Sequence, residues 1–218
     1  ISVSPANTSA SLTPTVLGSA SETSTVTLYF DSGCTTPKSS SVANTVFASP
    51  GIQVTSNVNS NTSTIIYGKA IDAAGNASTC ATLATYTHDG IGPSVTAVSS
   101  TATDGTYKVT ALQTIPITVT FSENVVVTGT PTITLETGAT DAVVSFSGAS
   151  GNTMTFSYTV FAGDTSADLD YISSSALVLA GGTIKDAYGN SATLTLPSPG
   201  AAGSIAASKA IVIDTTAP

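Results

Sequence analysis

Apolar and polar residues alternate along most of this chain, so that hydrophobic side chains recur at every second position. This period is typical of a β-strand with one buried face. The clearest run places Ile115, Ile117, Val119 and Phe121 on one side of an extended segment. The same pattern predicts strands at 13–18, 25–30, 52–54, 64–71 and 78–87, and then at 94–98, 115–121, 133–135, 144–146, 154–160, 177–179, 194–196 and 211–213.

No segment shows a helical period, and the apolar residues are largely Val and Ile interspersed with Thr and Ser, which favours strands. Turn-forming residues separate the short runs. Strands of this length and spacing are typical of Greek-key β-sandwiches. We therefore expect an all-β protein of two tandem immunoglobulin-like sandwich domains, residues 1–92 and 93–218.

The division into two domains follows from three acidic marks that occur twice in the same order. A Ser-Glu pair closes an apolar run, an Asp-Ala-x-Gly-Asn segment follows, and an Asp-x-x-x-Pro segment comes last. The first set is Ser21-Glu22, residues 72–76 and residues 89–93, and the second is Ser122-Glu123, residues 186–190 and residues 214–218.

Sandwich topology brings three of these marks to one place. The turns after the second strand and before the last strand both lie at the pole where the chain enters the domain. We therefore expect Glu123, the Asp186–Asn190 turn and the linker residue Asp89 to converge. Ca²⁺ binds six to eight oxygens from carboxylates, carbonyls and water. The hypothesis is a Ca²⁺ site at the domain junction with ligands from Asp89, Glu123, Asp186 and Asn190.

By the same logic Glu22 and Asp72 would form the corresponding site at the outer pole of the first domain, and Asp214 would serve a following domain. A purely structural alternative remains open. Asp-Ala-x-Gly-Asn is a favourable hairpin turn, because Gly and Asn tolerate positive φ and Asp bonds its own backbone. An Asp before a Pro-containing linker can likewise cap a turn.

A second acidic cluster, Asp164, Asp168 and Asp170, resembles a calcium loop only loosely. It lacks the Gly and the distal Glu of an EF-hand and it follows a strand. We interpret it as a capped turn with Tyr171 at the corner rather than as a metal site.

Composition limits the remaining functions. Five Lys and no Arg stand against thirteen Asp and Glu, a net charge of −8, and nucleic-acid binding needs the opposite balance. The 41% of hydrophobic residues and 8% of charged residues argue against disorder. No apolar stretch reaches the length of a membrane span. His88 is the only histidine, which argues against His-based zinc sites and a catalytic triad, and we expect it to face solvent.

Cys34 and Cys80 are the only cysteines. In a secreted protein two such residues flanking one domain core are expected to pair. The alternative is two free thiols.

Several of these segments resemble bacterial immunoglobulin-like (Big) repeats of large surface adhesins. The resemblance rests on residues 25–29, on 69–78 with their Asp-Ala-Ala-Gly-Asn, and on the Asp-x-x-x-Pro linker. The second domain is similar to the longer SwmB-type repeat at residues 119–125, 181–190 and 211–218. The resemblance implies tandem sandwiches on a cell surface with Ca²⁺-stiffened junctions, and by position it implies metal ligands at Asp72, Asp89, Asp186 and Asp214. The first linker departs from the pattern, because Asp89-Gly-Ile-Gly-Pro93 has two glycines that are expected to loosen it.

We therefore expect a non-enzymatic stalk segment of an extracellular or cell-surface adhesin. Its partners would be neighbouring repeats, and a tip outside this sequence would bind a host or cell-surface ligand. The lack of a signal peptide and the terminal linker are interpreted as signs of an excised piece. One alternative is a module that itself binds a glycan or protein, which an exposed aromatic-lined groove would favour. Another is an accessory domain of a secreted enzyme.

Overall fold

The structure is a computed structural model that describes residues 2–4, 7–109 and 114–216. The chain divides into two compact units, Ile1–Ile91 and Gly92–Pro218, and the boundary predicted from the sequence lies one residue later, after residue 92. Strands are the predominant regular structure of the described chain and little of it is helix, which confirms the all-β class.

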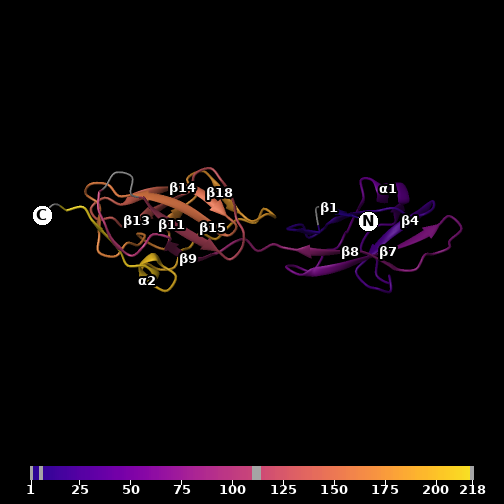
Figure 1. Cartoon of the computed structure of the whole chain (residues 1–218). Helices are drawn as coiled ribbons and strands as arrows, with labels where there is room; N and C mark the ends of the chain where they lie inside the picture. Colours follow the sequence, from indigo (N-terminus) through magenta and orange to yellow (C-terminus); the bar gives the residue numbers. More distant parts are fainter. Residues whose placement is uncertain (1, 5–6, 110–113, 217–218) are drawn as a thin grey trace. The chain divides into compact units, whose positions relative to one another are not determined.

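Unit 1 pairs its strands into two sheets (Figure 1). The larger sheet has the order β2-β8-β7-β4-β5 and the smaller has the order β1-β3-β6. Val16 of the small sheet and Leu28 and Ile66 of the large one are fully buried, so the core lies between the sheets. The elements are β1 (Ser2–Ser4), β2 (Thr8–Ser9), β3 (Thr15–Leu17), β4 (Ser24–Tyr29), β5 (Val42–Ala43), α1 (Asn44–Ala48), β6 (Ile52–Gln53), β7 (Ser63–Asp72) and β8 (Ala81–His88).

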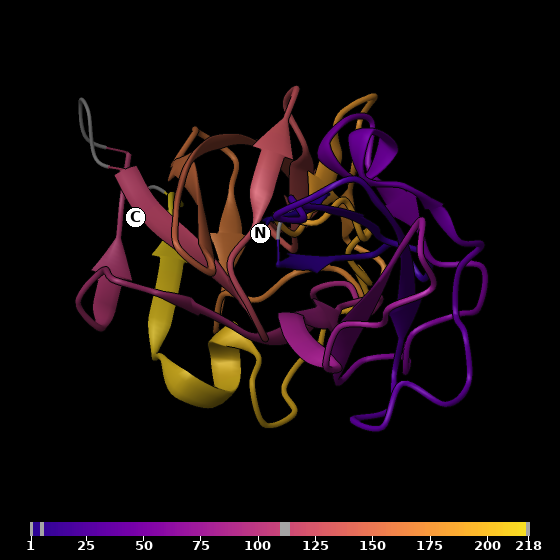
Figure 2. The ribbon, with the colours of Figure 1, turned by 90° about the vertical axis from the view of Figure 1, so that its right-hand side faces the viewer.

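Unit 2 has a six-stranded sheet of order β17-β13-β14-β15-β11-β9, together with the smaller sheets β10-β19-β16 and β12-β18. The helix α2 packs against β9 and leads directly into β19, as Figure 2 shows. The elements are β9 (Val95–Ser100), β10 (Gly105–Tyr107), β11 (Thr114–Phe121), β12 (Val126–Thr128), β13 (Thr132–Leu135), β14 (Ala142–Ser150), β15 (Thr153–Thr159), β16 (Thr165–Ser166), β17 (Leu177–Val178), β18 (Thr183–Lys185), α2 (Ile205–Ser208) and β19 (Ile211–Asp214).

The predicted strand faces are the ones that form the core of unit 2. Ile115, Ile117, Val119 and Phe121 are all at most 1% exposed, and the residues between them lie on the outer face. Across the ladder β15 contributes the equally buried face of Met154, Phe156 and Tyr158. The alternation that defines these strands in the sequence therefore also fixes which face meets the core.

Two of the sequence-based expectations about elements are wrong. The described residues contain two helices, α1 and α2, where none was predicted, because four or five residues are too few to show a helical period. Residues 194–196 form no strand, although Leu196 is buried. Its backbone N–H donates to the carbonyl of Ser174, so a single loop bond replaces a ladder there.

The two cysteines form a disulfide, as predicted. Cys34 and Cys80 lie 46 positions apart with 5.7 Å between their Cα atoms, and the bond joins the loop after β4 to the segment that precedes β8. Disulfides persist outside the reducing cytoplasm, so this bond is typical of a non-cytoplasmic protein. No helix of the described chain is long and apolar enough to cross a membrane.

Replacing both cysteines by serine should lower the unfolding free energy of unit 1 by about 4 kcal/mol, because the unfolded chain regains the entropy of an open loop of this length. Hydrogen exchange of the amides of Leu28 and Ile66 measures the loss. The amides of Ile117 and Phe156 in unit 2, which holds no cysteine, are the internal control. Unchanged exchange at Leu28 and Ile66 would contradict the prediction.

Candidate metal centre

The two Asp-Ala-x-Gly-Asn segments form the same hydrogen-bonded turn. In unit 2 the Oδ1 atom of Asp186 accepts the backbone N–H groups of Tyr188 and Asn190, both at 2.8 Å. Its Oδ2 atom accepts the side-chain amide of Asn190 at 2.6 Å. The backbone N–H of Asp186 closes the loop by donating to the carbonyl of Asn190 at 3.0 Å.

The corresponding turn in unit 1 repeats each of these bonds. Asp72 Oδ1 accepts from the backbone of Ala74 at 2.9 Å and of Asn76 at 2.8 Å, and Oδ2 accepts the Asn76 amide at 2.9 Å. The glycines have φ of +89° in unit 1 and +94° in unit 2, which only glycine adopts readily. The Asp therefore has a structural role in both turns, as the hairpin-turn alternative predicts.

Strand pairing places Glu123 beside the second turn. β12 pairs antiparallel with β18, and Val126 lies opposite Lys185. Because antiparallel strands run in opposite directions, the residues just before β12 lie next to the residues just after β18. Glu123 comes three residues before Val126 and Asp186 comes one residue after Lys185, so both carboxylates lie at the same end of this ribbon.

The chain entering unit 2 runs beside the segment that follows the turn. The carbonyl of Pro93 accepts the backbone N–H of Thr193 at 2.7 Å, and Ser94 forms a parallel bridge with Thr193. A Cβ atom at Gly92 would lie only 2.1 Å from the carbonyl oxygen of Ser191. The sequence predicts only flexibility from the two linker glycines, but Gly92 is required for this close approach of the backbone.

These contacts bring Asp89, Glu123 and Asp186 together. One carboxylate oxygen from each lies within 4.8 Å of the others. Asp186 is 4% exposed, and Asp89 and Glu123 are half-buried. Among the residues that the structure describes, no other three acidic, histidine or cysteine side chains come this close. Three carboxylates at this separation repel one another when ionised, and a cation removes the repulsion, so the trio could hold a metal ion.

The Asp186 carboxylate can serve both the turn and an ion. An ionised carboxylate offers about four lone-pair directions, and the turn uses three of them. Asn190 contacts the cluster through this carboxylate, because its side-chain amide nitrogen donates to Asp186. Asn190 thereby orients the most buried member of the trio.

The remaining predicted ligands lie elsewhere. Glu22 and Asp72 line one hollow of about 170 Å³ in unit 1, together with Asn76. Asp214 is the last residue of β19, and its Oδ1 atom accepts hydrogen bonds from the backbone N–H and the hydroxyl group of Thr216. These bonds, the hydroxyl bond first, hold the pKa of Asp214 below its usual value. The structure thus groups Glu22 with Asp72, and it gives Asp214 a turn-capping role.

Asp164, Asp168 and Asp170 do not form a cluster of ligands. Asp164 Oδ2 accepts the hydroxyl of Tyr158 and the backbone N–H of Phe161, at 2.7 and 2.9 Å. Asp170 is buried and accepts the backbone N–H groups of Tyr171 and Gly200. These bonds agree with the interpretation of a capped turn.

His88 does not face solvent, contrary to our expectation. It is 6% exposed, and its Nδ1 atom accepts the backbone N–H of Asn61 at 3.0 Å. Its own backbone N–H donates to the carbonyl of Thr62 at 3.0 Å, so two hydrogen bonds hold His88 against the segment that precedes β7.

No protein-family model matches the chain, and no curated protein matches it significantly. The candidate site therefore rests on the geometry described above.

The hydrogen bonds of the first turn lower the pKa of the Asp72 carboxyl, and this effect can be tested. The side-chain amide of Asn76, followed by its backbone N–H, holds the pKa of the Asp72 carboxyl below the ordinary value of 3.8. The stability that the ionised group contributes is therefore present above pH 3.8 and is lost as the pH falls below it. Replacing Asn76 by Ala should raise this pKa towards 3.8, as measured by NMR titration of the carboxyl carbon. Asn57→Ala, in an exposed loop, is the matched control, and an unchanged Asp72 titration in Asn76→Ala would refute the assignment.

Proposed function

We propose that this chain is a non-enzymatic structural segment of an extracellular or cell-surface adhesin, built from two immunoglobulin-like sandwiches of Greek-key topology. In this proposal a calcium ion bound by Asp89, Glu123 and Asp186 stiffens the connection between them. The observation that carries the proposal is the convergence of three carboxylates that lie 34 to 97 positions apart in the sequence.

The size of the cluster supports calcium as the ion. Ca²⁺ lies about 2.3–2.6 Å from its oxygen ligands, so two ligands on opposite sides of one ion are at most about 5.2 Å apart. The oxygens of the trio lie within 4.8 Å of one another, and one ion can therefore contact all three. Hard carboxylate ligands without sulfur or imidazole favour Ca²⁺ over zinc. Backbone carbonyls and water would supply the remaining ligands.

The positions of the three acidic residues in the chain support a stiffening role for the ion. Asp89 belongs to the segment just before Gly92, and Glu123 and Asp186 are fixed to the β12–β18 ribbon of unit 2. An ion bound to all three would tie the connecting segment to that ribbon. The resemblance to bacterial immunoglobulin-like surface repeats and the disulfide support an extracellular location. The partners would be neighbouring repeats, and a separate tip would bind the host or cell-surface ligand.

Calcium should raise the melting temperature of unit 2, because a ligand present at a hundredfold excess over its dissociation constant stabilises the state that binds it by about 2.7 kcal/mol. Calorimetric titration with CaCl₂ measures binding directly. Glu123→Gln should abolish the heat of binding and the stabilisation. Glu136→Gln, on an exposed glutamate of the same unit outside the cluster, should change neither. Wild-type protein that shows no heat and no stabilisation would exclude the calcium site.

The mechanical role is tested separately by small-angle scattering. Calcium should narrow the distribution of overall dimensions of the wild-type chain, and a chelator should reverse the effect. Glu123→Gln should show no response. Calcium binding without any change in scattering would retain the metal site and reject the stiffening role.

A further inference from the structure

Two neighbouring strands of the large sheet in unit 2 separate part of the way along. The pairing of β14 with β15 runs from Ser150↔Thr153 to Phe146↔Phe156, with an irregularity next to Phe146. Beyond that point residues 142–145 of β14 pair with β13, whereas residues 157–159 of β15 pair with β11. The sheet is therefore split between these two segments.

A cavity occupies the split. Its volume is about 780 Å³, within the range of about 300–1,000 Å³ that is usual for ligand sites. We call this cavity the β14–β15 notch. It is lined by residues 139–145, residues 157–159 and residues 161–164. Because β11 and β15 are antiparallel, the notch lies at the opposite end of β11 from Glu123.

One wall of the notch is a strand edge with its backbone groups directed outwards. The N–H of Phe146 donates to Pro131 on the β13 side. In an antiparallel ladder successive residues direct their N–H and C=O groups to opposite sides. The backbone N–H and C=O groups of Val143 and Ser145 therefore point away from β13, towards the notch. Such an edge is a template for another strand.

Two exposed hydrophobic side chains line the same notch. Val143 is 66% exposed and Phe161 is 65% exposed, the two highest values among the large hydrophobic residues that the structure describes. Exposed apolar groups gathered in one hollow are typical of binding sites.

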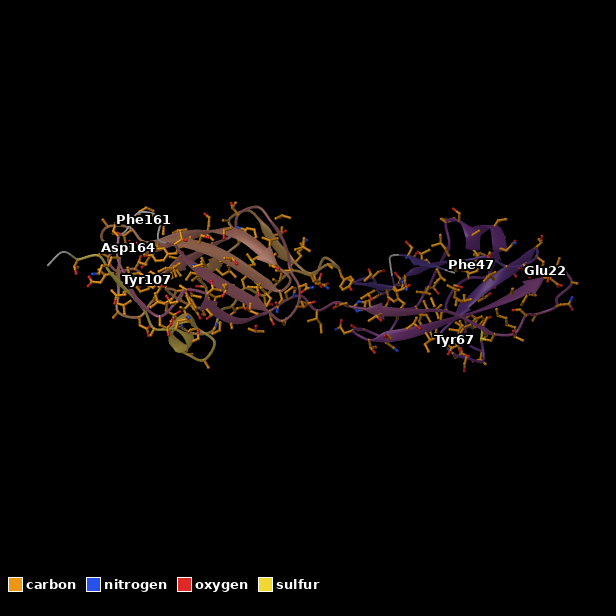
Figure 3. The ribbon with its side chains drawn as sticks, viewed as in Figure 1. Glu22, Phe47, Tyr67, Tyr107, Phe161 and Asp164 are labelled. Carbon is orange, nitrogen blue, oxygen red and sulfur yellow. A yellow bond between two sulfur atoms is a disulfide. The ribbon has the colours of Figure 1, made fainter. Side chains whose placement is uncertain are left out.

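The turn that carries Phe161 is fixed in place. The Oδ2 atom of Asp164 accepts the backbone N–H of Phe161 at 2.9 Å, and the backbone N–H of Asp164 donates back to the carbonyl of Phe161 at 3.1 Å. The Tyr158 hydroxyl holds the same carboxylate. Figure 3 shows Phe161 and Asp164 close together at one end of unit 2. A preorganised aromatic side chain loses little conformational freedom when it binds a partner.

The notch is acidic. Asp141 is exposed at its rim, Asp164 lies in its wall, and no lysine is among the residues that line it. The chain as a whole carries a net charge of −8. The charge of the site therefore complements a cationic partner and disfavours an anionic one.

We propose that the β14–β15 notch binds an extended, positively charged peptide segment. The peptide adds a strand to the edge formed by Val143 and Ser145 and packs its apolar side chains on Val143 and Phe161. A lysine or arginine side chain of the peptide pairs with Asp141. The outward-directed strand edge favours a polypeptide over a glycan, because only a polypeptide matches a ladder of alternating N–H and C=O groups. This site is independent of the proposed calcium site.

The test uses the intact chain and a phage library of random seven-residue linear peptides, in parallel with a panel of neutral oligosaccharides. We expect enrichment of peptides that alternate apolar residues with lysine or arginine. Synthetic copies should bind at least tenfold more weakly to Val143→Ser/Phe161→Ser, which removes both apolar side chains and leaves the charge unchanged, and several-fold more weakly to Asp141→Asn. Binding should also slow the hydrogen exchange of the Val143 and Ser145 amides. A proline in the middle of the peptide should abolish binding, because proline has no N–H to pair.

The matched control is Val178→Ser/Ile172→Ser, which changes exposed hydrophobic residues of the same unit outside the notch and should leave binding unchanged. Melting temperatures confirm that both double variants fold. No enrichment over Val143→Ser/Phe161→Ser would overturn the proposal. Enriched peptides that bind both double variants equally, or oligosaccharide binding that depends on Phe161, would also overturn it.

Discussion

Burial of every second side chain is the constraint on which both the sheets and the candidate metal centre depend. Ile184 is 2% exposed in the middle of β18, and it lies opposite Val127 in the β12–β18 ribbon. A slip of one residue would turn Ile184 to the solvent side, so the core fixes the register of this short pairing. That register in turn sets Glu123 beside Asp186. The packing of one isoleucine thus determines whether the two carboxylates meet.

The geometry of the acidic trio is compatible with both of the roles that the sequence presents as alternatives, the structural turn and the metal ligand. The Asp186 carboxylate closes its own hairpin and, in the same position, faces two further carboxylates. Asp72 closes an identical hairpin in unit 1, where Glu22 lines the same hollow. A turn that needs an aspartate for its own stability already provides one ligand, so one linker carboxylate and one glutamate are enough to make a cluster. The same Asp-Ala-x-Gly-Asn turn can therefore be purely structural in one domain and contribute to a candidate site in another.

The sequence predicted what depends on local alternation or on topology. The buried faces of β11 and β15 follow from period two, and the convergence of Asp89, Glu123 and Asp186 follows from the strand directions expected of a sandwich. It did not predict contacts made by loop residues or the point at which two paired strands separate. The burial of His88, the close approach of Gly92 to Ser191 and the split between β14 and β15 each arise from where two distant segments meet. The two short helices were missed because a single turn leaves no periodic signal.

The Cys34–Cys80 bond also determines how unit 1 responds to a pulling force. The chain between the two cysteines, which includes β5, α1, β6 and β7, lies outside the covalent path that carries tension. The length that unit 1 gains on complete unfolding is therefore smaller than without the disulfide. The difference is roughly 150–165 Å, at about 3.3–3.6 Å for each of the 46 positions that the bond spans. Unit 1 would therefore lengthen less under tension than the same chain without the disulfide.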